Sequence, residues 1–174
     1  DAVDLNPKRL ADLTAARDRL GFSQVQVHER HWIRERFGDR PKDEPYDAVL
    51  LDAPCSGLGV IRRHPDIRWA RVERDLPGFA ARQLKLLESL APAVKPGGAM
   101  VYAVCTFAPV ETHKTIAAFL KTKVAQNHGY RVVSAKTFLM GLPDDAFDGY
   151  ALRMYPHRHN ADGFYAVRLE RAEA

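Results

Sequence analysis

The sequence predicts an open α/β sheet, and three observations lead to this fold class. Short apolar segments alternate along the chain with longer segments whose apolar residues recur at helical spacing. The run from Ala48 to Leu51 is continuously apolar and bounded by aspartates, which is typical of a strand buried on both faces of a parallel sheet. The 174 residues are 46% hydrophobic and 28% charged, which allows a sizeable core within one domain.

The elements near the start of the chain have clear local signals. A short strand ending at Asp4 precedes a helix predicted over residues 5–21. Asn6 suits the N-cap, because its side chain can accept a bond from a free backbone N–H, and Gly21 is a natural stop. A second short strand is predicted over residues 25–27.

The later elements are assigned by the same criteria. Leu84, Leu87 and Leu90 form the inner face of a helix, and the "KPGG" tetrapeptide indicates a tight turn. We predict a strand over 46–54, a helix over 75–93, a turn over 95–98, a strand over 99–105, a helix that opens at Pro109, and closing strands over 130–138 and 163–171.

Charge and cysteine content exclude several classes of protein. The formal net charge of +4 is a mild basic bias and says little about partners by itself. The two cysteines belong to no Cys-x-x-Cys pair or Cys/His array, so we expect no metal site, no disulfide framework and a cytoplasmic location. No apolar run approaches the ~20 residues of a membrane-spanning helix, so we expect no membrane association.

Four reactive side chains fall near one predicted edge of the sheet. Asp4, Asp52 and Cys105 each end a predicted strand, and Cys55 lies three residues beyond Asp52. Taken singly, a cysteine is more often a small core residue and an aspartate more often a cap or turn former. Their joint placement at carboxyl ends of strands, where open α/β sheets bind ligands, favours a functional site.

Five motifs then resemble one family. "DAPCSG" at 52–57 and "VYAVC" at 101–105 resemble the two cysteine motifs of the RNA cytosine-5 methyltransferases. "GVIRRHPDIRW" at 59–69 is similar to the bacterial 16S ribosomal RNA methyltransferase B (Sun/Fmu) group within that family. "AVDLNPKRL" at 2–10 and "DGFYAVRL" at 162–169 resemble its second strand with the following helix and its closing strand. The resemblance covers nearly the whole chain and implies a Rossmann-like fold that uses S-adenosylmethionine.

The resemblance also implies roles for the reactive side chains. Cys105 is the nucleophile that adds to carbon 6 of cytosine, which makes carbon 5 reactive, and Cys55 assists release of the RNA adduct. Asp52 is the carboxylate that contacts the cytosine ring, and we also place it in the cofactor site. Asp4 matches the acidic residue that binds the cofactor ribose. Glu29 is the one residue that could replace the family's aspartate near the adenine.

The segment after Cys55 is strongly basic. Residues 60–74 hold five arginines against two acids, and so carry a formal charge of +3. We expect Arg62 and Arg63 to bind RNA phosphates, and His64 and Arg68 to contact RNA beside them. Trp69 could stack on an extruded base. The alternative for this segment is a solvated helix start with ordinary ion pairs.

The nucleophile should also be activated by its surroundings, because the thiolate is the reactive form. We expect Arg62, Arg63 and the start of the helix at Pro109 to favour the Cys105 thiolate. Two departures from the family pattern lie nearby. Val104 stands where the family usually has threonine, and only the glutamate of a Glu-Glu-Asn pattern is kept, at Glu111.

In this family a glycine-rich cofactor motif precedes the segment that "AVDLNP" of this chain resembles. No segment of this chain matches that glycine-rich motif. We therefore expect residues 1–174 to be a partial catalytic domain, from its second strand onward. This piece alone should be inactive and should partner a missing N-terminal segment of the same protein.

Three other functions stay open from the residues. An amino-group methyltransferase usually carries Pro-Pro-aromatic where this chain has Ala-Pro-Cys. A catalytically impaired RNA-binding fragment or pseudoenzyme is favoured by the missing motif and by Val104. A redox protein would use both cysteines, but no Cys-x-x-Cys pair supports it.

Overall fold

The computed structural model describes residues 1–29 and 45–173. The chain forms two compact units, Asp1–Lys42 and Asp43–Ala174, and each is described by itself. Within the described part of the chain, every helix is too short or too polar to span a bilayer.

The Asp1–Lys42 unit contains a strand, a helix and a second strand parallel to the first. These are β1 (Ala2–Asp4), α1 (Pro7–Leu20) and β2 (Val27–Glu29). Asn6 caps α1 by accepting bonds from two backbone N–H groups, and Gly21 ends it in the left-handed conformation with φ 73°. Both signals were predicted from the sequence, whereas the strand expected over 25–27 begins at Val27.

The Asp43–Ala174 unit is built on a mixed sheet of six strands. These are β3 (Tyr46–Asp52), β4 (Val94–Val104), β5 (Arg131–Val133), β6 (Phe147–Asp148), β7 (Ala151–Met154) and β8 (Phe164–Glu170). The strand order is β3-β4-β8-β7-β6, and β5 pairs with the other end of β8. β3 and β4 run parallel, and β8 is antiparallel to β4. This arrangement confirms the α/β class and is consistent with a Rossmann-like methyltransferase fold.

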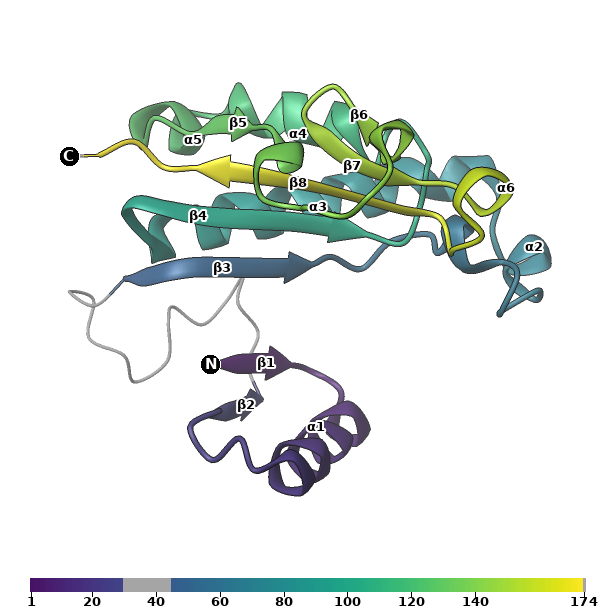
Figure 1. Ribbon diagram of the computed structural model, residues 1–174, viewed down its shortest axis with the longest axis horizontal. Coiled ribbons are helices and arrows are strands. Elements are labelled where there is room, and N and C mark those ends of the chain that lie inside the picture. The colour runs from purple at the N-terminus through teal and green to yellow at the C-terminus, as the bar shows by residue number, and fades with distance from the viewer. Residues whose placement is uncertain (30–44, 174) are drawn as a thin grey trace. The chain divides into compact units, whose positions relative to one another are not determined.

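Five helices accompany this sheet: α2 (Ile67–Ala70), α3 (Leu76–Leu90), α4 (His113–Leu120), α5 (Lys123–Asn127) and α6 (Pro156–His159). α3 and α4 contact each other and lie behind the sheet in Figure 1. The core forms between them and the sheet, where Leu87, Met100, Phe119 and Leu169 are fully buried. The helix expected over 75–93 is confirmed as α3 with a short 3₁₀ turn over 91–93.

The strand at 46–54 differs from the prediction in its burial. It pairs in parallel with β4 as expected, but Leu50 is 70% exposed and Ala48 is also exposed. Leu51 is the one buried residue of β3, and β3 lies at the edge of the described sheet. The predicted turn at 95–98 is instead an irregular first part of β4. There the register with β3 breaks and Gly97 has φ 74°.

Two further boundaries were predicted wrongly. The helix expected to open at Pro109 begins at His113, because the backbone of Thr112 is not helical, with φ −112° and ψ −114°. The Glu111 carbonyl just before it accepts a hydrogen bond from the Tyr102 hydroxyl at 2.6 Å. The strand expected over 130–138 ends at Val133. β5 can pair only with one end of β8, because β7 occupies the other end.

Candidate active site

Two thiols meet at the edge of the sheet where β3 and β4 both end. The arrowheads of these parallel strands point the same way in Figure 1, towards α2 and α6. The ladder continues past Asp52, since the Ala53 N–H donates to the Ala103 carbonyl at 2.9 Å. This pairing brings Cys55, three residues beyond β3, to Cys105, directly beyond β4, with 3.3 Å between the two Sγ atoms. The predicted convergence of Asp52, Cys55 and Cys105 is therefore present.

The two thiols differ in acidity. The two sulfurs lie within hydrogen-bond distance, and the bond that the Cys55 thiol donates to the Cys105 thiolate lowers the pKa of Cys105 to about 7. Burial and the negative charge of Asp52 act in the opposite direction but are weaker. The same hydrogen bond, together with burial, raises the pKa of Cys55 far above its ordinary value. The pair therefore loses its first proton from Cys105, and Cys55 stays a thiol at neutral pH.

The loop after Cys55 is fixed by a close crossing of two glycines. The Gly59 N–H donates to the Cys105 carbonyl at 2.9 Å, and the Gly163 N–H donates to the Gly59 carbonyl at 2.7 Å. A Cβ on Gly59 would lie 2.0 Å from the Gly163 oxygen, so no side chain fits there. This crossing ties the loop to the end of β4 and to the start of β8.

A fully buried carboxylate lies behind the two thiols. Glu111 accepts bonds from the Ser56 N–H at 2.9 Å, from the Ser56 hydroxyl, from the Gln83 amide at 3.0 Å and from the Thr106 hydroxyl at 3.4 Å. Gln83 also donates to the Pro54 carbonyl at 3.0 Å. One buried group thus contacts residues next to both cysteines.

The two arginines expected to activate the nucleophile form ion pairs with an aspartate instead. Arg62 and Arg63 both pair with Asp162, which lies just before β8, and Arg62 also donates to Asn160 at 3.4 Å. Their side chains are more than half exposed. The expectation that these arginines and a helix at Pro109 favour the thiolate is wrong. The acidity of Cys105 comes first from Cys55, and the helix begins only at His113.

The remaining residues of the basic segment lie on the surface. His64 and Arg68 are exposed, and Trp69 is 85% exposed with the Arg68 guanidinium 5.9 Å from its ring. Arg71 points inward instead, because its Nε donates to the Ser56 carbonyl at 3.2 Å. The segment therefore offers an exposed cationic and aromatic surface next to the loop that carries Cys55.

Asp4 and Glu29 lie together in the other unit, as register partners at the ends of β1 and β2. Asp4 Oδ1 accepts bonds from the backbone N–H groups of Leu5 at 2.7 Å and Asn6 at 2.9 Å. These bonds, the Asn6 bond above all, lower the pKa of Asp4 and keep it ionised. Asp4 therefore forms the turn before α1, and the N-cap of that helix is Asn6. Whether Asp4 joins the thiols in one site stays a prediction.

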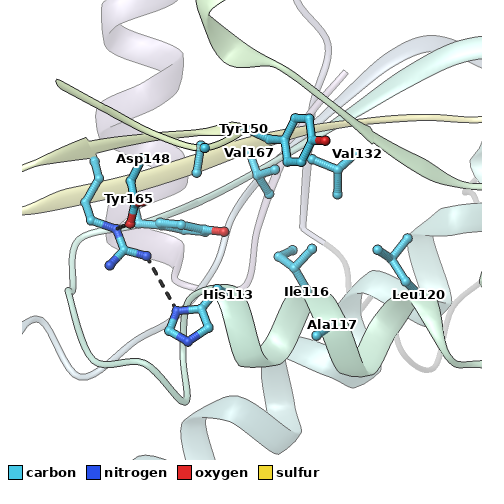
Figure 2. A pocket seen from close by; sticks show the side chains of 12 residues that line it. His113, Ile116, Ala117, Leu120, Val132, Asp148, Tyr150, Tyr165 and Val167 are labelled. Carbon is cyan, nitrogen blue, oxygen red and sulfur yellow. Dashed lines mark hydrogen bonds and ion pairs between the residues drawn. The ribbon is translucent and has the colours of Figure 1, made fainter. Parts of the chain in front are cut away.

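A separate cavity of about 430 Å³ opens between α4 and the strands β5, β7 and β8. Figure 2 shows its apolar floor, with Ile116 and Leu120 on the helix side and Val167 on the sheet side. At one end, Arg153 pairs with Asp148 and donates to His113 Nδ1 at 3.5 Å. The cavity includes neither cysteine and was not foreseen from the sequence. The described residues contain no cluster of three or more side chains suited to hold a metal ion.

Sequence reasoning missed Gln83 and Asp162. Gln83 precedes Leu87 by four residues and Leu90 by seven, so it lies on the buried stripe of α3. A polar residue on an apolar stripe was the available signal. Asp162 carried no such signal, because its partnership with Arg62 and Arg63 joins segments about a hundred residues apart.

Comparison with known proteins gives consistent matches. Residues 1–170 match the family model described as 16S rRNA methyltransferase RsmB/F. The chain is 37% identical over 169 residues to the ribosomal RNA small subunit methyltransferase B of Enterobacter sp. (strain 638), covering 97% of this chain and 36% of that protein. It is 36% identical over 177 residues to the protein of that name from Shewanella oneidensis, covering 98% of this chain and 37% of that protein.

Solved structures agree with these matches. The crystal structure of PH0851 superposes with a TM-score of 0.81 at 32% identity, covering 98% of this chain and 36% of that one. A methyltransferase homologue from Pyrococcus horikoshii gives a TM-score of 0.72 at 27% identity, covering 98% of this chain and 52% of that one. The chain thus spans about a third of the length of the curated relatives it matches.

Proposed function

Because this chain belongs to the 16S rRNA methyltransferase RsmB/F family, we propose that its protein methylates carbon 5 of a cytosine in small-subunit ribosomal RNA. The methyl donor is S-adenosylmethionine, and the reaction passes through a covalent bond between Cys105 and the base. The observation that carries this proposal is the pair of thiols 3.3 Å apart, of which Cys105 is the more acidic.

Cys105 suits the nucleophile. With a pKa of about 7, roughly half of it is thiolate at neutral pH, which is the form that attacks. The thiolate sulfur bonds to carbon 6, and the electron pair of the carbon 5–carbon 6 double bond becomes available at carbon 5. After carbon 5 is methylated, its proton leaves, the double bond re-forms and Cys105 departs as a thiolate. Asp52, at the same edge of the sheet, is the carboxylate proposed to contact the base.

Cys55 suits the release step for a physical reason. In the free protein its pKa is raised first by the hydrogen bond that it donates to Cys105. Once Cys105 carries the base as a thioether, its sulfur is uncharged and is a weak acceptor, so this cause is removed. The pKa of Cys55 then falls, although burial still raises it, and the fraction that is thiolate can take the carbon 5 proton. Release of the adduct therefore needs Cys55, whereas its formation needs Cys105.

The carboxylates of the first unit fit the cofactor's hydroxyl groups. S-adenosylmethionine supplies an electrophilic methyl group, and its ribose needs acceptors for two hydroxyls. Asp4 is held ionised, and among the described residues its Oδ2 pairs with exposed Arg9 at 3.6 Å. Glu29 lies beside it on β2. We assign Asp4 to the ribose and Glu29 to the adenine side, and we propose Asp52 as a further residue that contacts the cofactor.

RNA binds along the basic segment in this proposal. Arg62 and Arg63 are exposed cations beside the Cys55 loop, and Asp162 holds them in place rather than burying them. Phosphate contacts would position the RNA, and His64, Arg68 and Trp69 are exposed for contact with unpaired bases.

The test uses full-length protein with radiolabelled S-adenosylmethionine and small-subunit ribosomal RNA. We expect 5-methylcytosine in the product and none with Cys105→Ala. Cys55→Ala should retain the RNA as a denaturation-resistant adduct, which the double variant should not form. No methyl transfer by the wild-type protein, with RNA binding intact, would instead favour an RNA-binding pseudoenzyme. Identical behaviour of the two single variants would refute the assigned roles.

A further inference from the structure

The buried carboxylate of Glu111 is unusual in its partners. The side chain is fully buried, yet the described residues provide it with no ion pair. Its partners are instead neutral donors: one backbone N–H, two hydroxyls and one amide. Burying a carboxyl group is costly unless its oxygens are well bonded, and here both oxygens accept two bonds each. The arrangement is therefore a polar network in which both carboxylate oxygens are bonded, and not an accidental burial.

The positions of the donors connect this network to the thiols. Ser56 directly follows Cys55, and Thr106 directly follows Cys105. The two loops come from different strands, and Glu111 bonds to both of them. The Ser56 and Thr106 hydroxyls also lie 3.0 Å apart, so the one Thr106 hydroxyl proton is shared between the Ser56 oxygen and Glu111 and links the two loops in either case. A single carboxylate thus holds the residue next to each sulfur.

Gln83 bonds to the residue on the other side of Cys55, Pro54. Its amide nitrogen donates both to Glu111 Oε2 and to the carbonyl of Pro54, each at 3.0 Å. The orientation of the amide is fixed, because a flipped amide would put its oxygen against two acceptors. In this orientation Gln83 Oε1 is buried without a partner among the described residues, which costs free energy. Despite this cost, the network fixes the backbone on both sides of Cys55.

We propose that Glu111 is a positioning residue that sets the separation of the Cys55 and Cys105 sulfurs. This inference rests on the proposed function, because the thiol pair matters only if both sulfurs take part in the reaction. Glu111 touches neither sulfur, and it acts through Ser56 and Thr106. Without its carboxylate, four donors lose their shared acceptor and the two loops are free to separate.

Two substitutions distinguish positioning from charge. Glu111→Gln removes the charge but keeps the shape. Its oxygen can accept from the Ser56 N–H and from Gln83, and its nitrogen can donate to the two hydroxyls, which can rotate to accept. Glu111→Ala removes both charge and shape. If position matters, glutamine should rescue what alanine loses, and a purely electrostatic role would make the two variants alike.

The first measurement reports the thiol pair without any methyl transfer. Phenylarsine oxide condenses with two neighbouring thiols and releases one water, so its capture, measured by intact mass, reports sulfurs held close together. In full-length protein we expect Glu111→Ala to weaken capture about tenfold and Glu111→Gln to stay near wild type. Tyr130→Phe is the matched control, because it removes a buried hydroxyl bond to the Ala91 carbonyl away from the thiols. It should capture the arsenical like wild type.

The second measurement is steady-state methyl transfer. We expect Glu111→Ala to lower kcat about 100-fold with little change in KM for RNA, because the defect is misplacement of the reacting groups. If Glu111→Ala does not fold, Gln83→Met decides the question, since it removes two of the donor contacts at similar volume and should also weaken capture. Normal capture by a folded Glu111→Ala or Gln83→Met protein would overturn the inference. Normal capture by wild type without methyl transfer would overturn only the proposed function.

Discussion

Removing the Cys55 thiol should raise the pKa of Cys105, and the size of the change follows from the structure. In the wild-type protein the Cys55 hydrogen bond holds the pKa of Cys105 at about 7 against burial and the charge of Asp52. Cys55→Ala removes the stabilising bond and leaves the opposing influences, so the pKa should reach at least the ordinary 9.0. At pH 7 the thiolate fraction then falls from roughly one half to roughly one hundredth, about a 50-fold loss.

The assay is alkylation of Cys105 by iodoacetamide between about pH 5 and 10, with the labelled peptide quantified by mass spectrometry. The midpoint of the rate profile gives the pKa, and it is insensitive to the lower intrinsic reactivity of acidic thiols. We expect about 7 for wild type and 9 or above for Cys55→Ala. Cys55→Ser is the matched variant, because its hydroxyl can still donate to the thiolate, and its midpoint should lie between them. A midpoint that stays near 7 in Cys55→Ala would refute the assigned cause.

This shift also affects how the covalent adduct is trapped. In the proposed mechanism, Cys55→Ala should slow release of the adduct, but it should also remove most of the attacking thiolate at neutral pH. Adduct accumulation with this variant should therefore increase with pH up to about 9, where Cys105 ionises again. Trapping only at neutral pH would underestimate the role of Cys105.

Three other predictions follow from the same geometry. Gly59→Ala should lower the free energy of unfolding by about 2–4 kcal/mol in urea titration, because the added Cβ has no room beside Gly163. Gly78→Ala lies in open space on α3 and should change the free energy by about 1 kcal/mol or less. Equal urea midpoints for the two variants would contradict a tight crossing of Gly59 and Gly163. Arg62→Gln should weaken RNA binding and reduce the slope of log K against log salt by about 0.9, while Arg131→Gln on β5 should leave the slope unchanged. Methyl transfer by wild type should decline below pH of about 7 as Cys105 is protonated, and a flat profile down to about pH 5 would contradict the thiolate mechanism.

The sequence predicted the elements whose signals are local. The cap at Asn6, the stop at Gly21 and the stripe of leucines in α3 each depend on residues within one helix, and all are present. The meeting of Cys55 with Cys105 was also predictable, because parallel strands end at the same edge of a sheet.

The errors concern positions set by distant parts of the chain. The exposure of Leu50 depends on what covers one face of β3, and α4 starts late because the backbone of Thr112 is not helical. The acidity of Cys105 was assigned to the nearest arginines in sequence. In the fold, however, Asp162 engages Arg62, and the hydrogen bond comes from the other thiol. Long-range pairing of this kind leaves no periodic signal in a single sequence.

The crossing of Gly59 with Gly163 has a consequence for how the protein acquires its site. It joins residues about a hundred positions apart, and β8, the last of the described strands, lies in the middle of the sheet. A growing polypeptide on the ribosome therefore holds both cysteines long before it holds the strand and the glycine that fix their loops. Assembly of the thiol pair should be among the last events of folding, so a nascent chain would be unable to react with the RNA around it until β8 has emerged.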